Sequence, residues 1–328
     1  MKIANCLVLV IVLVAVSAPS TGLAEWQPHV VRQLNGKAGP FRLPARFQIV
    51  TESWNRVVAV PYIVNMPEKG RVLMLVGCDY PHRAFVLTSD DHGGTWTDPR
   101  PARVGKDGKP SIGMGTALAY LGKGKLMFYE SGGLAVGLPS RWFSSDFGKT
   151  WGNPVPIAVS SDKMAWHIWD PPLVERHPKT GKVTRLAETG YRQSGTSSSA
   201  SIRFSGDQGR TWKKSIQVPQ WRGANEVYLF RAGNGHLLAA CRTDVPRRLK
   251  GKTLDHYEGL GVSISRDDGL TWSPVKKIYD YGRHHQSLVL MPNKDIVMTY
   301  VVRLGLSLIH ISEPTRRYAI SYAVFCLK

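Results

Sequence analysis

Cysteine is scarce in this chain, with four residues among 328, which excludes a scaffold held together by disulfides. Cys6 lies in an N-terminal segment that we expect to be removed, and Cys326 lies close to the C-terminus. Cys78 and Cys241 each lie in an apolar, strand-like run, where a small buried thiol is the usual arrangement. We therefore predict two buried thiols and no structural disulfide.

Long apolar runs are also scarce, and the main one is N-terminal. Residues 4–16 are almost all apolar and follow Lys2, a pattern typical of a secretory signal peptide and too short to span a bilayer comfortably. Cleavage after Ala18 would leave Pro19 at the cut, so we favour cleavage after Ala24. We expect export to the periplasm or the medium without a stable membrane anchor; a buried N-terminal helix is the alternative.

Acidic residues are few relative to basic ones. The chain has 43 Lys and Arg against 24 Asp and Glu, a formal net charge of +19. Such an excess favours anionic partners. We expect an acidic glycan as the partner, and neither nucleic acid nor a cofactor.

The last 23 residues, 306–328, read "LSLIHISEPTRRYAISYAVFCLK". Their first part resembles the conceptual translation of a transposase-type sequencing-library adapter, and "ISYAVFCL" resembles that of its flow-cell end. We therefore predict a non-native tail and exclude it from the expected fold; a genuine last strand is the alternative. Residues 25–305 then form the expected domain, which we predict to be incomplete at its C-terminal end.

A motif, Ser-x-Asp-x-Gly-x-Thr-Trp, occurs four times. The copies occupy residues 89–96, 144–151, 205–212 and 265–272. Their tryptophans are 55, 61 and 60 residues apart, and a nearly fixed period of this size indicates radial or solenoid repetition.

Each repeat carries three alternating, strand-like runs before the motif and a shorter run rich in Pro and Val after it. Period-two alternation without a long helical pattern predicts an all-β fold. Four strands per repeat predict a β-propeller blade, and a fifth repeat begins near His284. Tandem small domains or a β-helix are the alternatives.

The residues of the motif suit a structural role. Ser and Asp can accept hydrogen bonds from nearby backbone N–H groups, Gly permits a left-handed conformation, and Trp can bury a large ring between sheets. Calcium binding by Asp91 or Asp267 is the alternative, but the oxygen density of an EF-hand is missing, and we predict no metal site. The residues expected to staple the blades are Asp91, Trp96, Asp146, Trp151, Asp207, Trp212, Asp267 and Trp272.

The four motifs resemble the Asp-box (BNR) repeat of sialidases, also called neuraminidases, and the resemblance covers residues 57–303. It implies a six-bladed propeller with its site on the axis, truncated here after the start of the fifth blade. It also implies a retaining exo-α-sialidase, in which a Glu activates a nucleophilic Tyr, an Asp serves as acid/base and three Arg bind the substrate carboxylate. A neutral phenol suits this substrate, because the sugar's own carboxylate would repel an anionic nucleophile.

Glu226 and Arg242 match the Tyr-activating Glu and the second Arg of this pattern. They begin and end two adjacent runs in "NEVYLFRAGNGHLLAACR", and antiparallel pairing would bring them together; a surface ion pair is the alternative. Arg303 ends the second strand of the fifth repeat, where the third Arg is expected.

The first repeat departs from the pattern, because Ala59 occupies the place of the first Arg. Arg56 would replace it if the strand bulges there, and an exposed edge arginine is the alternative. Asp79 lies where the resemblance implies the acid/base, although an ordinary turn aspartate fits the sequence equally.

Residues that open inner strands are expected to line the pocket: Trp166, His167, Trp169, Asp170, His284 and His285. The aromatic run suits either sugar stacking or blade packing, and the His pair lacks a third metal ligand at suitable spacing.

The nucleophilic Tyr is expected beyond Arg303, and Tyr318 and Tyr322 fall in the excluded tail. We therefore expect the polypeptide as written to be inactive and prone to aggregate through an unpaired sheet edge. Two other functions stay open: a non-catalytic Asp-box propeller that binds glycan or protein, and a glycosidase that uses two carboxylates, with Asp79 and Asp170 as candidates.

Overall fold

The computed structural model describes residues 29–31, 41–43, 50–51, 54–131, 139–157, 167–194, 197–249, 257–302 and 321–327. The predicted signal peptide, Trp166 and Arg303 lie outside these residues. Within them, no helix is both long enough and apolar enough to cross a membrane.

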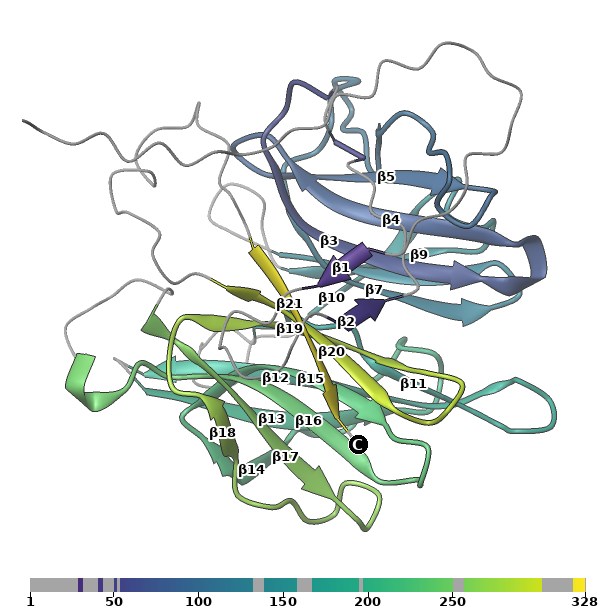
Figure 1. Cartoon of the computed structure of the whole chain (residues 1–328). Helices are drawn as coiled ribbons and strands as arrows, with labels where there is room; N and C mark the ends of the chain where they lie inside the picture. The colour runs from purple at the N-terminus through teal and green to yellow at the C-terminus, as the bar shows by residue number, and fades with distance from the viewer. Residues whose placement is uncertain are drawn as a thin grey trace, which may run out of the picture.

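The fold is all-β and propeller-like, with four four-stranded antiparallel sheets that follow one another along the chain (Figure 1). In each sheet the strands are neighbours in sequence order. The first two sheets contain β3 (Val58–Met66), β4 (Arg71–Cys78), β5 (Arg83–Ser89), β6 (Arg100–Pro101), and then β7 (Gly115–Gly122), β8 (Lys125–Glu130), β9 (Ser140–Ser144) and β10 (Gly152–Pro156). The next two contain β11 (Leu173–Arg176), β12 (Val183–Ser194), β13 (Ser197–Ser205), β14 (Ile216–Arg222), and then β15 (Ala224–Arg231), β16 (Leu237–Thr243), β17 (Gly259–Ser265) and β18 (Lys276–Tyr279).

A fifth sheet has three strands, β19 (Arg283–Leu290), β20 (Ile296–Val302) and β21 (Ser321–Leu327). Smaller elements are the hairpin β1 (His29–Val31) with β2 (Phe41–Leu43) and the short helices η1 (Pro67–Lys69) and η2 (Arg247–Leu249). Residues 306–328 are predicted to lie outside the fold, whereas β21 pairs with β20 along its whole length. The pairing does not test the origin of this segment, which stays a prediction.

Apolar cores lie between successive sheets. One core joins Leu73 of the first sheet to Leu118 of the second, and another joins Met127 of the second to Leu186 of the third. The other face of β4 packs against Trp54 and Trp96, so both of its faces are covered and it is buried without interruption from residue 73 to residue 78. Cys78 and Cys241 lie in these buried strands as free thiols, as predicted.

The Asp boxes connect the third and fourth strands of each sheet, as predicted, and the first box shows their hydrogen bonding. The Ser89 hydroxyl donates to Asp91 Oδ1 at 2.7 Å and accepts from the backbone N–H of Gly93 at 2.7 Å. The backbone N–H and the hydroxyl of Thr95 both donate to Asp91 at 2.8 Å. These hydrogen bonds, led by the one from the Thr95 backbone, lower the pKa of Asp91 to about 2.

The other three boxes repeat this network around Asp146, Asp207 and Asp267. A box also packs against the preceding sheet: a Cβ at Gly148 would lie 2.2 Å from Cδ1 of Leu73, at a φ of +78°. The boxes are therefore hydrogen-bonded turns, and their role in stapling the sheets together stays a prediction.

Candidate active site

The inner strands share an irregularity near their first residues. The pairing register shifts in β3, β7, β15 and β19, where one strand gains a residue relative to its partner. Three residues at these bulges adopt a left-handed backbone: Val60 (φ 45°), Glu226 (φ 41°) and His285 (φ 54°). Bulges re-aim side chains, and left-handed non-glycine residues concentrate at functional sites.

Glu226 and Arg242 form a buried ion pair at this end of the fourth sheet. Asn225 pairs directly with Arg242 in the register of β15 and β16. Glu226 Oε1 lies 3.0 Å from Arg242 Nη1, and the two side chains are 4% and 13% exposed. The predicted meeting of the two strand ends is confirmed, and the pair is buried instead of lying on the surface.

His285, on β19, approaches Glu226 from the fifth sheet. Its Nδ1 lies 3.1 Å from Glu226 Oε2. The next residue, Gln286, donates its side-chain amide to the backbone oxygen of Glu226 at 2.6 Å and to that of Ala240 at 2.9 Å. Two adjacent residues of one strand therefore hold the side chain and the backbone of Glu226.

The segment 167–170 lies near the Glu226–Arg242 pair, and residues from three sheets form hydrogen bonds to its backbone. The hydroxyl of Thr116 donates to the backbone oxygen of Ile168 at 3.0 Å, and the hydroxyl of Tyr62 donates to that of Trp169 at 2.6 Å. His167 and Tyr191 exchange backbone hydrogen bonds at 3.2 and 3.0 Å. These contacts fix the backbone that carries Trp169, whose ring lies 6.4 Å from that of His285.

Asp170 ends this segment as a buried carboxyl group, 8% exposed. Burial raises its pKa well above the ordinary range, and the negative charge of Glu226 raises it further. Burial and the charge of Glu226 therefore both favour the neutral form of the Asp170 carboxyl group.

Arg56 and Asp79 form a second group at the end of the first sheet. Arg56 Nη1 lies 2.7 Å from Asp79 Oδ2, and the guanidinium lies over the ring of Phe85, 4.6 Å from its centroid. Among the described residues, no contact joins this pair to Glu226. The structure thus brings Trp169, Asp170, Arg242 and His285 to Glu226 and places Arg56 and Asp79 in a pair of their own.

Sequence reasoning missed Glu258, which lies immediately before β17. Its Oε2 lies 3.1 Å from Nε of Arg242. Glu258 belongs to no repeated motif, and its approach depends on a loop, so only its position before a Gly-rich strand could have drawn attention to it.

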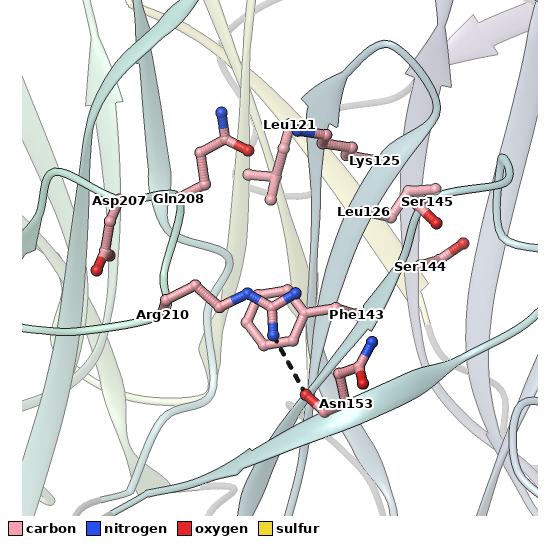
Figure 2. A pocket seen from close by; sticks show the side chains of 10 residues that line it. All are labelled: Leu121, Lys125, Leu126, Phe143, Ser144, Ser145, Asn153, Asp207, Gln208 and Arg210. Carbon is pink, nitrogen blue, oxygen red and sulfur yellow. Dashed lines mark hydrogen bonds between the residues drawn. The ribbon is translucent and has the colours of Figure 1, made fainter.

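The described residues also enclose a cavity of about 320 Å³ away from this group (Figure 2). It lies between the second sheet and the third Asp box, where Arg210 covers the ring of Phe143 at 3.7 Å and donates to the backbone oxygen of Asn153 at 3.4 Å. The lining residues are Leu121, Lys125, Leu126, Phe143, Ser144, Ser145, Asn153, Asp207, Gln208 and Arg210. The described residues contain no group of three or more His, Cys, Asp or Glu side chains placed to hold a metal ion.

Solved structures share this fold at low sequence identity. A Dyadobacter fermentans protein of unknown function is 18% identical, with a TM-score of 0.57 and 76% of each chain covered. Trypanosoma rangeli sialidase is 18% identical, with a TM-score of 0.51, 84% of this chain covered and 46% of the sialidase, so the chain spans less than half of that enzyme. An endo-arabinase from Bacteroides thetaiotaomicron is 12% identical, with a TM-score of 0.54, 87% of this chain covered and 98% of the arabinase.

No curated protein matches the chain. The BNR repeat-like domain family, however, matches residues 139–312, just over half of the 328 residues. This match includes three of the four Asp boxes and the Glu226–Arg242 pair. The chain therefore belongs to the BNR repeat-like domain family.

Proposed function

We propose that the protein is an exported, retaining glycoside hydrolase of the sialidase type, which releases terminal sialic or related acidic sugars from glycans. The observation that carries this proposal is the buried Glu226, aimed by a bulge with φ 41° and held between Arg242 and His285. The positive net charge supports an anionic substrate. Trypanosoma rangeli sialidase, which shares the fold, has been solved with sialic acid bound.

Glu226 acts as the base in this proposal. It takes the phenolic proton of a tyrosine as the tyrosine oxygen bonds to the anomeric carbon, while an acid protonates the departing glycosidic oxygen. Water then attacks the anomeric carbon and gives a proton to the conjugate base of that acid, while Glu226 returns its proton to the departing tyrosine oxygen, so the two displacements retain the configuration. The resemblance to sialidases implies that this tyrosine follows Arg303.

Replacing Glu226 tests the proposal. In protein expressed from the source gene, Glu226→Gln is expected to lower the turnover of an aryl sialoside about 100-fold or more, because the general base is lost, while sialic acid still binds. Glu175→Gln is the matched control, because Glu175 also contacts two cations, Arg185 and Arg231, and Arg231 ends β15 at the opposite end from Glu226. Equal turnover in both variants would contradict the role of Glu226 as the base, whereas sialic acid binding without turnover in the unchanged protein would favour a non-catalytic propeller.

A second candidate is a hydrolase that uses two carboxyl groups on a neutral sugar. The raised pKa of the buried Asp170 favours it, because such a hydrolase requires a carboxyl group that can act as an acid. Ala59, in the place of the first substrate-binding Arg, also favours a neutral sugar. Cleavage of an aryl arabinoside with no cleavage of the sialoside would select this candidate.

A further inference from the structure

Arg242 contacts more groups than the ion pair with Glu226 requires. Its Nη1 faces Glu226 at 3.0 Å, whereas its Nε lies 3.1 Å from Oε2 of Glu258 and donates to Oδ1 of Asn225 at 2.6 Å. One guanidinium therefore stands between two carboxylates. Its charge is shared between them, and its plane is set by contacts on both sides.

Glu258 is itself fixed in place. Its residue exposure is 9%, and its backbone oxygen accepts a hydrogen bond from the N–H of Gly282 at 2.7 Å. The next residue, Gly259, packs closely against the end of β18, because a Cβ there would lie 2.4 Å from the backbone oxygen of Asp280. The backbone at Glu258 is therefore closely packed, which fixes the position from which its side chain contacts Arg242.

Asn225 completes this arrangement from the opposite strand. Its side-chain amide donates to the hydroxyl of Ser198 at 3.1 Å, which leaves Oδ1 for Arg242. Ser198 is held in turn by Asp244, whose Oδ2 accepts its backbone N–H at 2.8 Å. The amide orientation that Arg242 needs is therefore supported by a neighbouring sheet.

We propose that Glu258 is a positioning residue that holds Arg242 against Glu226 and draws part of its positive charge away from Glu226. The inference rests on the proposed function, in which Glu226 is the base and Arg242 meets the substrate carboxylate. A base must not be stabilised too strongly as an anion, because its proton affinity then falls. Sharing Arg242 with Glu258 weakens the attraction between Arg242 and the Glu226 carboxylate, and it also weakens the attraction of Arg242 for an anionic sugar.

Glu258→Gln separates these two effects, because it keeps the shape and removes the charge. We expect kcat on an aryl sialoside to fall about tenfold and KM to fall about threefold, since one unit of pKa corresponds to a tenfold change in proton affinity. The acid limb of the kcat profile is expected to move to lower pH. The control Glu175→Gln also removes a carboxylate shared by two arginines and is expected to leave kcat, KM and the pH profile unchanged.

A fall in kcat with a rise in KM, or no change in either, would overturn the charge sharing.

A second measurement tests the contact between Glu258 and Arg242 and needs no enzymatic activity. It is a double-mutant cycle on urea unfolding with Glu258→Gln and Arg242→Gln. We expect the double variant to unfold at a higher urea concentration than the two single changes predict by addition, because the contact is lost only once. Additive changes would overturn the positioning role, whereas absent turnover in every variant with a clear coupling would reject the proposed function alone.

Discussion

The outer Asp boxes and the axial ends of the inner strands come from the same repeats, yet they differ in how strictly they repeat. All four boxes use the same Ser, Asp and Thr hydrogen bonds. At the axial bulges, by contrast, the residues differ from sheet to sheet: Val60, Thr116, Glu226 and His285. The outer region therefore carries the architecture, and the axial region carries the variation from which a site can be built.

The largest expected effect on stability is in the outer region. Trp272 is 5% exposed and packs against Trp221, with ring centroids 4.7 Å apart. Trp272→Ala is expected to lower the free energy of unfolding by about 3 kcal/mol, because it leaves a cavity between two sheets. Urea unfolding measures the loss.

Trp96→Ala is the matched control, because Trp96 holds the same box position but is only partly buried, against the core of the first sheet. A smaller loss is expected there. Equal losses at the two positions would break the link between box stability and burial of the ring.

The carboxyl groups of the two regions are expected to respond to pH with opposite sign. Burial raises the pKa of Asp170 in the folded chain, whereas the carboxyl group of the unfolded chain has an ordinary pKa of about 4. The contribution of Asp170 to the free energy of unfolding is therefore present below that pH and is lost as pH rises toward the folded pKa. Asp170→Asn is expected to remove this decline above about pH 4.

Asp267 provides the contrast, because hydrogen bonds from Thr271 and Ser265 lower its pKa to about 2. Its contribution is present above the unfolded pKa and is lost as pH falls toward 2. Asp267→Asn should therefore reduce the loss of unfolding free energy as pH falls toward 2. It should leave the dependence of the unfolding free energy on pH unchanged near neutral pH. If the free energy of unfolding depended on pH in the same way in Asp170→Asn and Asp267→Asn, the opposite pKa shifts of the two groups would be contradicted.

The smallest expected effect concerns the bulge of the first sheet. A β-branched residue is strained at the φ of 45° that Val60 adopts. Val60→Gly should relieve this strain, which offsets the entropy that glycine adds to the unfolded chain, so the free energy of unfolding should change by less than about 0.5 kcal/mol.

Val64→Gly, on the same strand and packed against the core, should cost about 1–2 kcal/mol. Denaturant midpoints of the two variants provide the comparison. A larger loss at Val60 than at Val64 would show that the bulge is not strained.

The parts of the fold that repeat were accessible from sequence. The spacing of the four tryptophans predicts the sheets, and the antiparallel hairpin predicts the meeting of Glu226 with Arg242, because both follow from local periodicity. The bulges were not accessible, because one extra residue leaves the alternating pattern almost unchanged. The contact of Glu258 with Arg242 and the pairing of Arg56 with Asp79 depend on loop conformations that no periodic signal encodes.

Each bulge adds one residue to an inner strand and leaves the pairing on either side intact. The side chains at Val60, Thr116, Glu226 and His285 can therefore change without altering the strand behind them. In evolutionary terms, the residues that maintain the fold of such a blade differ from the residues that determine its chemistry. A lineage built on this repeat can acquire a new substrate by exchanging a handful of residues, while the Asp boxes remain as they are.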